Sequence, residues 1–392
     1  GGVFCLNLFV NISISHSVFN HSRAKKGSCL FISGSHSSQS VISYNNLFYN
    51  NTAVQSGGCI SIFLCSKILM TLSQYFHNAV KKNEGGALKI ERVTTAVLQN
   101  NTFSNNLALS SDGGALFALK TDSIFTNNCI FDFNLAHFDG GAAKLVNMKT
   151  FAILKSTLLN NSAGQHGGAI SVFLHRVLQE NIISITFCLF SYNTANGSGA
   201  SLAITGVKEI QLLKNDIQDS GVNSQANVIT LQSLVLSMQN VSFGNIKSNR
   251  IIVEASISEL IETDFVEFIC PQYTYLKETS ETSSREHFHD CASSNFCQMV
   301  LKYQCLTCYG NTYIVHLDPW VISRELHIRK SRKDVYCYSC PIGGKCISGK
   351  VFSLPNYWGY VKKYQVVFVK CPQEFCCHAS PCNSYNGCNV GR

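Results

Sequence analysis

A Gly-Gly dipeptide returns at nearly constant spacing through the first half of the chain, and this repeat constrains the fold more than any other feature. The clearest copies are Gly57-Gly58-Cys59-Ile60, Gly85-Gly86-Ala87-Leu88, Gly113-Gly114-Ala115-Leu116, Gly140-Gly141-Ala142-Ala143 and Gly167-Gly168-Ala169-Ile170, at steps of 28, 28, 27 and 27 residues. Degenerate copies at Gly1-Gly2-Val3-Phe4, Gly27-Ser28-Cys29-Leu30 and Ser198-Gly199-Ala200-Ser201 continue the register. Such a period is the signature of a repeat architecture whose units pack on their neighbours.

A second motif, Phe followed three positions later by Asn, keeps phase with the glycines. Ser, Asn, Gly, Val, Ile, Thr and Phe dominate these units and favour strands and turns, and period-2 alternation recurs where a helical period does not. We therefore expect an all-β parallel β-helix in which each residue lies roughly 4.8 Å from its counterpart one coil earlier. The expected ladders are an aromatic one at Phe48, Phe76, Phe103, Phe131 and Phe190, with Leu158 in the same slot, and an amide one at Asn51, Asn106, Asn134 and Asn193.

The alternation of Gly-Gly-Ala-Ile/Leu with Phe-x-x-Asn resembles the repeats of the chlamydial polymorphic outer-membrane proteins, which also occur in large surface proteins of eukaryotes. The match covers residues 1 to 200 well and residues 200 to 265 weakly, where Phe243-Gly244-Asn245 is nearly the only trace. The resemblance implies a right-handed parallel β-helix exposed at a cell surface.

Cysteine usage divides the chain, since residues 1 to 269 hold six cysteines and residues 270 to 392 hold thirteen. That second density is typical of a disulfide-stapled secreted module, so we expect a β-helix over 1–265 and a small Cys-rich module over 266–392. Because thirteen is odd, we expect this module to be truncated at its C-terminal end. The disulfide candidates are Cys270, Cys291, Cys297, Cys305, Cys308, Cys337, Cys340, Cys346, Cys371, Cys376, Cys377, Cys382 and Cys388.

Within the tail, Cys305-x-x-Cys308 and Cys337-x-x-Cys340 have the spacing of metal-binding knuckles, but the nine other nearby cysteines favour disulfides over zinc. The segment from Cys337 to Cys346, then Pro355 to Tyr360 and Cys371-Pro372, resembles the ephrin-receptor-like Cys-rich modules of large surface proteins. In such proteins membrane helices commonly follow, so the resemblance implies membrane attachment through sequence beyond residue 392.

The residues before four successive glycine pairs are Glu84, Asp112, Asp139 and His166. A strict register places them along one edge at roughly 4.8 Å spacing, where like charges repel. A bound cation such as Ca²⁺, a raised pKa or divergent rotamers would relieve the repulsion, whereas solvated turn residues need no relief. Because polysaccharide-cleaving β-helix enzymes use clustered carboxylates, these four residues are also the catalytic candidates of an enzyme alternative.

The net charge of +8 is spread along the chain, so nucleic acid is not an expected partner. One basic cluster, Arg324, His327, Arg329, Lys330, Arg332 and Lys333, is either a solvated loop or a patch for sulfated glycans or anionic lipids. Another polar cluster, His287-Phe288-His289-Asp290-Cys291, lies in a stretch that reads as a linker. N-glycosylation sequons occur at Asn11, Asn20, Asn50, Asn100, Asn160, Asn196 and Asn240.

From these features we expect a non-catalytic, extracellular or cell-surface protein with an adhesion, recognition or structural role and no cofactor. Its partner would be a protein or glycan ligand at a cell surface, and the chain would be part of a larger secreted or membrane-anchored protein. The alternative is a carbohydrate-active, pectin-lyase-like β-helix enzyme.

Overall fold

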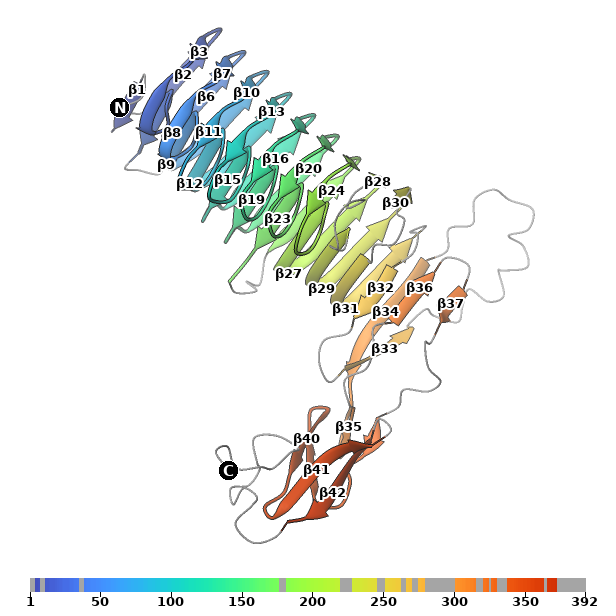
Figure 1. The fold of residues 1–392 in the computed structure, drawn as a ribbon. Coiled ribbons are helices and arrows are strands. Elements are labelled where there is room, and N and C mark those ends of the chain that lie inside the picture. The colour runs from blue at the N-terminus through green and yellow to red at the C-terminus, as the bar shows by residue number, and fades with distance from the viewer. Residues whose placement is uncertain are drawn as a thin grey trace, which may run out of the picture. The chain divides into compact units, whose positions relative to one another are not determined.

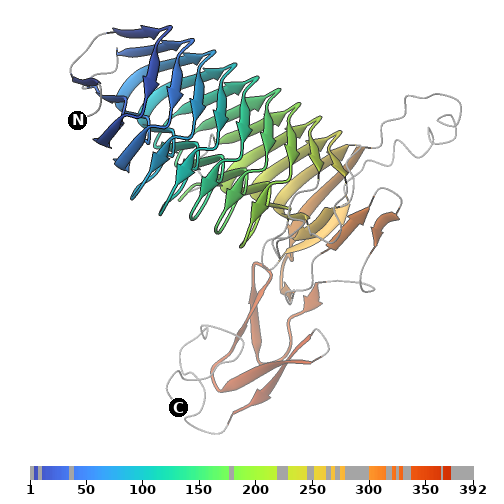
Figure 2. The same ribbon diagram turned by 45° about the horizontal axis from the view of Figure 1, so that its top comes forward.

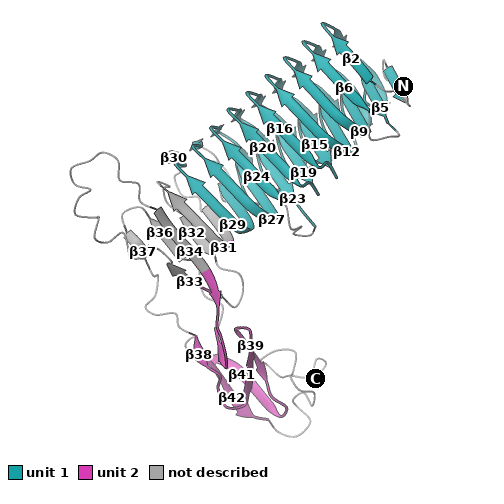
Figure 3. Ribbon diagram, turned by 180° about the vertical axis from the view of Figure 1, so that it is seen from behind, with its two compact units in different colours: residues 1–253, 259–266, 298–300 teal, residues 254–258, 267–297, 301–392 magenta. Residues whose placement is uncertain are grey.

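A computed structural model describes residues 4–7, 11–34, 39–175, 181–218, 228–244, 251–261, 266–269, 274–278, 300–314, 320–323, 326–329, 337–362 and 365–371. Every regular element in these ranges is a β-strand, which confirms the all-β class (Figure 1). The chain forms two compact units, the first comprising residues 1–253, 259–266 and 298–300 and the second residues 254–258, 267–297 and 301–392 (Figure 3).

The first unit is a parallel β-solenoid of about eight turns, as the repeat predicts. Figure 2 shows its coils stacked with their strands side by side. One wall is a sheet of three-residue strands: β3 (Val18–Asn20), β7 (Leu47–Tyr49), β10 (Gln74–Phe76), β13 (Thr102–Ser104), β17 (Ile130–Asp132), β21 (Thr157–Leu159), β25 (Leu189–Ser191), β28 (Asp216–Gln218) and β30 (Ser242–Gly244). A shorter wall contains β4 (Arg23–Lys26), β8 (Thr52–Ser56), β11 (Ala79–Val80), β14 (Leu107–Ala108), β18 (Leu135–Ala136), β22 (Ser162–Ala163) and β26 (Thr194–Ala195).

The third and longest wall follows each glycine pair. Its strands are β1 (Phe4–Asn7), β2 (Asn11–Ser15), β5 (Leu30–Ser33), β6 (Ser40–Tyr44), β9 (Ile60–Thr71), β12 (Leu88–Gln99), β15 (Leu116–Leu119), β16 (Ser123–Asn127), β19 (Ala143–Val146), β20 (Thr150–Leu154), β23 (Ile170–Phe173), β24 (Ile182–Thr186), β27 (Leu202–Leu213), β29 (Ile229–Gln239) and β31 (Ile251–Ile261). Alternate residues of these strands are buried, which is the burial pattern of a strand with one face on the core.

The glycine pairs make the bend into the long wall possible. Gly113 has a φ of 68°, in the left-handed region that favours glycine, and a Cβ on Gly114 would collide with the Gly141 carbonyl of the next coil. The coils therefore approach one another at these bends more closely than any side chain allows.

Two corners join the walls, and both use a residue with positive φ followed by a buried polar residue. The second corner lies between the wall of three-residue strands and the shorter wall. Its buried residue is Asn in six successive coils: Asn51, Asn78, Asn106, Asn134, Asn161 and Asn193. The Nδ2 atom of each of the first five donates to Oδ1 of the Asn in the next coil. For example, Nδ2 of Asn106 donates to Oδ1 of Asn134 at 3.0 Å, and it also donates to the Tyr75 carbonyl at 2.9 Å. The amide ladder expected at Asn51, Asn106, Asn134 and Asn193 is thus present, with Asn78 and Asn161 as additional members.

The aromatic ladder runs inside the coils through Phe19, Phe48, Tyr75, Phe103 and Phe131 with the rings stacked. The centroids of Phe103 and Phe131 are 4.9 Å apart with an interplanar angle of 4°. Leu158 and Phe190 continue the same register position.

Phe76 does not belong to this ladder, so the prediction that placed it there was wrong. The register aligns Tyr75, and not Phe76, with Phe48 and Phe103. Because successive side chains of a strand point to opposite faces, Phe76 lies on the outer face of β10, where it is half-buried, and Tyr75 is fully buried.

The second unit contains short antiparallel pairs. Its strands include β33 (Thr274–Glu278), β34 (Val300–Thr307), β35 (Thr312–Tyr313), β36 (Trp320–Ser323), β37 (Leu326–Arg329), β38 (Tyr338–Ser339), β39 (Gly344–Ile347), β40 (Lys350–Ser353), β41 (Tyr357–Lys362) and β42 (Gln365–Lys370), and β32 (Val266–Ile269) lies at the junction in sequence. Tyr313, Cys346, Val351 and Val366 form its small buried cluster.

Candidate functional site

The carboxylates before the glycine pairs stack along one edge of the first unit, as a strict register requires. Their backbones are joined coil to coil, since the N–H groups of Gly85, Gly113 and Gly140 donate to the carbonyls of Asp112, Asp139 and His166. We call the set Glu84, Asp112, Asp139 and His166 the edge column.

Two carboxylates of the edge column also hold the next coil through side-chain contacts. Oδ1 of Asp112 accepts from the backbone N–H of Asp139 at 2.9 Å, and Oδ1 of Asp139 accepts from the backbone N–H of His166 at 3.0 Å. These oxygens act as intercoil hydrogen-bond acceptors.

Lysines compensate the charge of the edge column. Nζ of Lys144 lies 2.6 Å from Oδ2 of Asp139 and 3.0 Å from Oγ of Ser171, with the Lys144 side chain 8% exposed. Lys89 lies 3.1 Å from Glu84 and 3.6 Å from Glu91. Neither lysine belongs to the repeat motifs, but each follows its acid by five residues, across the Gly-Gly bend, and this spacing is the sequence signal for both ion pairs.

Asp112 has no such close lysine partner among the ion pairs found in the described ranges. Burial raises the pKa of its carboxyl above the ordinary value, while the Asp139 N–H and, more weakly, Lys144 act in the opposite direction. The charged form of Asp112 is therefore less favourable in the folded chain than in the unfolded one.

This pKa direction predicts the pH dependence of an Asp112→Asn variant. A raised carboxyl pKa contributes stability below the ordinary pKa and loses it as the pH rises through the folded-state pKa. Asparagine keeps the oxygen acceptor and carries no charge, so the variant should gain stability relative to the wild type between about pH 4 and pH 7. Urea unfolding of both proteins at the two pH values measures this, and an unchanged or reversed difference would refute it.

His166 and Ser198 form the most reactive-looking pair at this edge, with Nδ1 of His166 2.8 Å from Oγ of Ser198. A nucleophilic triad needs a carboxylate on the second ring nitrogen to orient the imidazole. Asp139, the nearest acid in the column, contacts the backbone N–H of His166 instead of its ring. The four catalytic candidates therefore lie in one column. The side-chain hydrogen bonds of Asp112 and Asp139, however, run to the backbone of the next coil.

The described ranges contain no group of three or more His, Cys, Asp or Glu side chains placed to hold a metal ion. At the edge column Lys89 and Lys144 supply positive charge beside Glu84 and Asp139, which is the compensating role that a bound cation would otherwise have.

Several coils of the first unit carry exposed apolar side chains, and the coil of residues 130–138 carries four of them. Ile130 is 44%, Phe133 54%, Leu135 45% and Phe138 38% exposed, and Leu109 of the preceding coil is 48% exposed. Ile130 and Leu135 lie on strands of neighbouring walls, β17 and β18, and Phe133 lies on the corner between them. We call these five residues the apolar patch, and none of them belongs to a repeat motif of the sequence.

Several sequon asparagines lie next to the buried ladders, not in them. Asn50, Asn100 and Asn160 have positive φ and each precedes a buried Asn, which for Asn50 and Asn160 is a member of the amide ladder. Asn11, Asn20, Asn50 and Asn196 are exposed, whereas Asn100, Asn160 and Asn240 are partly buried. Oδ1 of Asn100 accepts from Asn128, and Nδ2 of Asn160 donates to Asp132, so these two amides already have partners.

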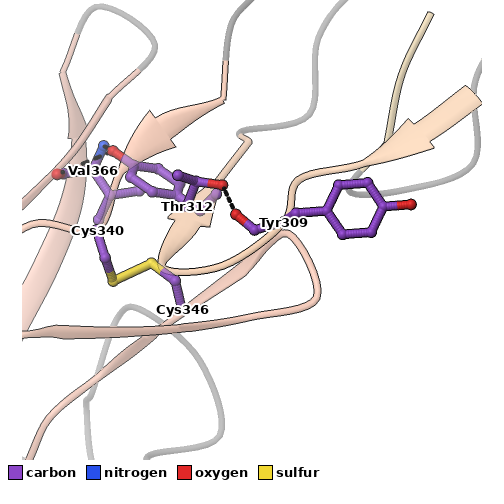
Figure 4. The surroundings of a disulfide bond; sticks show 6 residues. Tyr309, Thr312, Cys340, Cys346 and Val366 are labelled. Atoms are coloured by element: carbon purple, nitrogen blue, oxygen red, sulfur yellow. Dashed lines mark hydrogen bonds between the residues drawn. A yellow bond between two sulfur atoms is a disulfide. The ribbon is translucent and has the colours of Figure 1, made fainter.

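In the second unit the knuckle cysteines are oxidised. Disulfides join Cys308 to Cys337 and Cys340 to Cys346, and Cys305 and Cys371 are also disulfide-bonded. Figure 4 shows the Cys340–Cys346 bond near Val366, whose N–H donates to the Tyr313 hydroxyl at 2.7 Å. Disulfides, not zinc, therefore use these described thiols.

The remaining disulfide candidates, Cys270, Cys291, Cys297, Cys376, Cys377, Cys382 and Cys388, lie outside the described residues, as does the His287–Cys291 cluster. The same holds for Arg324, Lys330, Arg332 and Lys333 of the basic cluster, and the side chains of His327 and Arg329 are not described.

Comparison of the chain with protein-family models, curated proteins and solved structures gives no significant match. Nor do the described residues include a helix long and apolar enough to cross a membrane.

Proposed function

We propose that this chain is a non-catalytic recognition module of an extracellular or cell-surface protein, in which the β-solenoid presents the apolar patch to a protein or glycan partner. The observation that carries the proposal is the side chain of Phe133, which is 54% exposed at a corner with φ of 50°. A bulky residue in this conformation is strained, and a large exposed ring gains nothing from burial in the isolated chain.

Other coils show what the corner accepts. Asn50, Asn105 and Asn160 occupy the equivalent position, and Asn tolerates left-handed backbone better than an aromatic residue does. His21, His77 and Tyr192 occupy the same position in the other coils, and Tyr192 is 56% exposed with φ of 54°. Exposed aromatic and apolar side chains are the residue types that form the energetic centre of recognition surfaces.

The edge column supports a non-catalytic role over the enzyme alternative. Asp139 is committed to Lys144 and to the next coil, and Asp112 accepts a backbone hydrogen bond, whereas a glycosidase needs one carboxyl free to donate a proton and another free to attack or to activate water.

The proposal also includes an extracellular location of the protein and its glycosylation. The disulfides of the second unit favour an oxidising compartment, and exposed sequons such as Asn50 offer sites for glycans. The repeat pattern supports kinship with the polymorphic outer-membrane-protein repeats, and the tail supports kinship with the ephrin-receptor-like modules.

A Phe133→Asn variant tests the recognition role. Relief of the strained backbone should raise the stability of the first unit by about 1 kcal/mol, while loss of the ring should weaken binding to cells of the organism that makes the protein. Binding of the labelled chain is measured by flow cytometry, and protease or glycosidase treatment of the cells separates a protein from a glycan partner.

Asn105→Gly, on the preceding coil, is the matched control, because it changes an equivalent corner outside the apolar patch. Equal binding by the wild type and Phe133→Asn would refute the patch as the recognition surface. Release of products from polygalacturonate or neutral polysaccharides, abolished by Asp112→Asn, would establish the enzyme alternative instead.

A further inference from the structure

The buried thiols of the first unit differ in what they contact. Sγ of Cys65 donates to the Gln39 carbonyl at 3.1 Å, and Sγ of Cys188 donates to the Thr186 carbonyl at 3.3 Å. Cys129 accepts from the Asn101 N–H at 3.4 Å and donates to backbone carbonyls. The sulfurs of Cys129 and Cys188 replace polar side chains in the hydrogen bonding of the stack, whereas the register partner of Cys65 is Val93.

Cys29 and Cys59 occupy a different position, directly after the glycine bend. In five other coils this position holds alanine, at Ala87, Ala115, Ala142, Ala169 and Ala200, and all five are fully buried. Both cysteines are 0% exposed. The repeat thus departs from alanine in the same way in two consecutive coils.

The two cysteines are stacked directly on one another. The N–H of Cys29 donates to the Cys59 carbonyl at 2.9 Å, and the following strands β5 and β9 pair in register from Leu30 and Ile60. Equivalent residues of adjacent parallel strands lie about 4.8 Å apart, which is within the roughly 4.4 to 6.8 Å between Cα atoms that a disulfide spans.

Both residues are buried free thiols in the structure, and burial raises the pKa of Cys59. On the other side of Cys59 the next coil offers only the methyl group of Ala87, whose N–H and carbonyl are used between backbones. Two fully buried thiols at one register position of adjacent coils are placed for bond formation.

We propose that Cys29 and Cys59 form a disulfide that joins two adjacent coils of the solenoid. It forms by exchange with a donor disulfide, such as oxidised glutathione, before the coils close. One cysteine thiolate attacks the donor and releases one donor thiolate, and the second cysteine thiolate then attacks the mixed disulfide and releases the other. Two cysteine thiols are oxidised, the donor is reduced to two thiols, and the two cysteine protons end on the donor sulfurs.

Two properties of the chain agree with this reaction. Cysteines of the second unit are already paired as disulfides, so the same oxidising conditions reach the first unit during folding. After closure both sulfurs are fully buried, which keeps reductants away and makes the bond persistent.

The test counts free thiols in the full chain after folding in a glutathione redox buffer and denaturation in guanidinium. If Cys29 and Cys59 are paired, Cys29→Ala frees Cys59 and raises the count by one relative to the wild type. If both are free thiols, the same variant lowers the count by one. The exposed, free Cys5 gives the control, since Cys5→Ser lowers the count by one in either case.

Peptide mapping without reduction identifies the bond. We expect a peptide containing Cys29 linked to one containing Cys59, with Cys129 and Cys188 alkylated as free thiols after denaturation. The linked peptide disappears in Cys29→Ala/Cys59→Ala, which carries the residue of the other coils and therefore keeps the fold. Recovery of Cys29 and Cys59 as alkylated thiols from the wild type, or a link from either to another cysteine, would overturn the proposal.

Discussion

Replacing Asn106 with alanine should destabilise the first unit by about 4 kcal/mol, because it leaves several buried polar groups without partners. Oδ1 of Asn106 accepts from both the backbone N–H and Nδ2 of Asn78, each at 3.1 Å, and Nδ2 of Asn106 donates to the Tyr75 carbonyl. All of these groups are buried, so water cannot replace the lost side chain without opening the corner. Chemical denaturation measures the loss.

Asn105 provides the matched control for this ladder prediction. It precedes Asn106, is exposed, and has a φ of 56°, a conformation that glycine adopts freely. Asn105→Gly should change the unfolding free energy by less than about 0.5 kcal/mol. If the two variants unfold alike, the ladder does not hold the coils together.

Asp139→Asn should cost about 3 kcal/mol at neutral pH, since it leaves the ammonium group of Lys144 buried without its counter-ion. This free-energy loss is at the low end of the range for breaking a buried ion pair, because the Asp139 side chain is 17% exposed. Adding Lys144→Met removes the unpaired charge, and the double variant should recover most of the stability. Urea unfolding of the single and double variants measures both effects.

Glu84→Gln is the comparison for that ion pair. Lys89 is more exposed and has Glu91 at 3.6 Å as a second partner, so the loss should stay below about 1 kcal/mol. If Asp139→Asn leaves stability unchanged, the structural role of this carboxylate is wrong.

The repeat predicted the parts of the fold in which one residue type recurs at one place in every coil. The glycine bends and the Asn ladder are of this kind, because a strained backbone and an intercoil amide bond each admit few residue types. Tyr75 could also have been found, because it precedes Asn78 by the same three residues that separate Phe103 from Asn106. Tyrosine fills the phenylalanine position in this coil, and the neighbouring Phe76 faces outward.

At the first corner, before the three-residue strands, no single residue type repeats from coil to coil. Its buried position holds Asn46, Ser73, Asn101, Cys129, Ser156, Cys188 and Asn215, and their side chains bond neighbouring coils. Amide, hydroxyl and thiol groups all satisfy a backbone N–H there, so the chemistry repeats while the residue does not. Two cysteines that looked unassigned in the sequence have this structural role.

The position of the edge column could be predicted from the repeat motifs, but the lysines that compensate its negative charge could not. The spacing placed Glu84, Asp112 and Asp139 on one edge, but a lysine five residues later contacts its acid only because the Gly-Gly bend turns the chain back. The apolar patch depends in the same way on three-dimensional placement, since Ile130 and Leu135 belong to different walls.

Distances between spin labels along one wall test the stacking of coils most directly. Val18, Ile130, Thr157 and Leu189 occupy one register position of the three-residue strands, and Ile130, Thr157 and Leu189 lie four, five and six coils from Val18. With Cys5 replaced by Ser, labels at Val18 and each of the other three should lie about 19, 24 and 29 Å apart, increasing by about 4.8 Å per coil. Distances that do not increase by a constant step would contradict the solenoid and every role assigned from it.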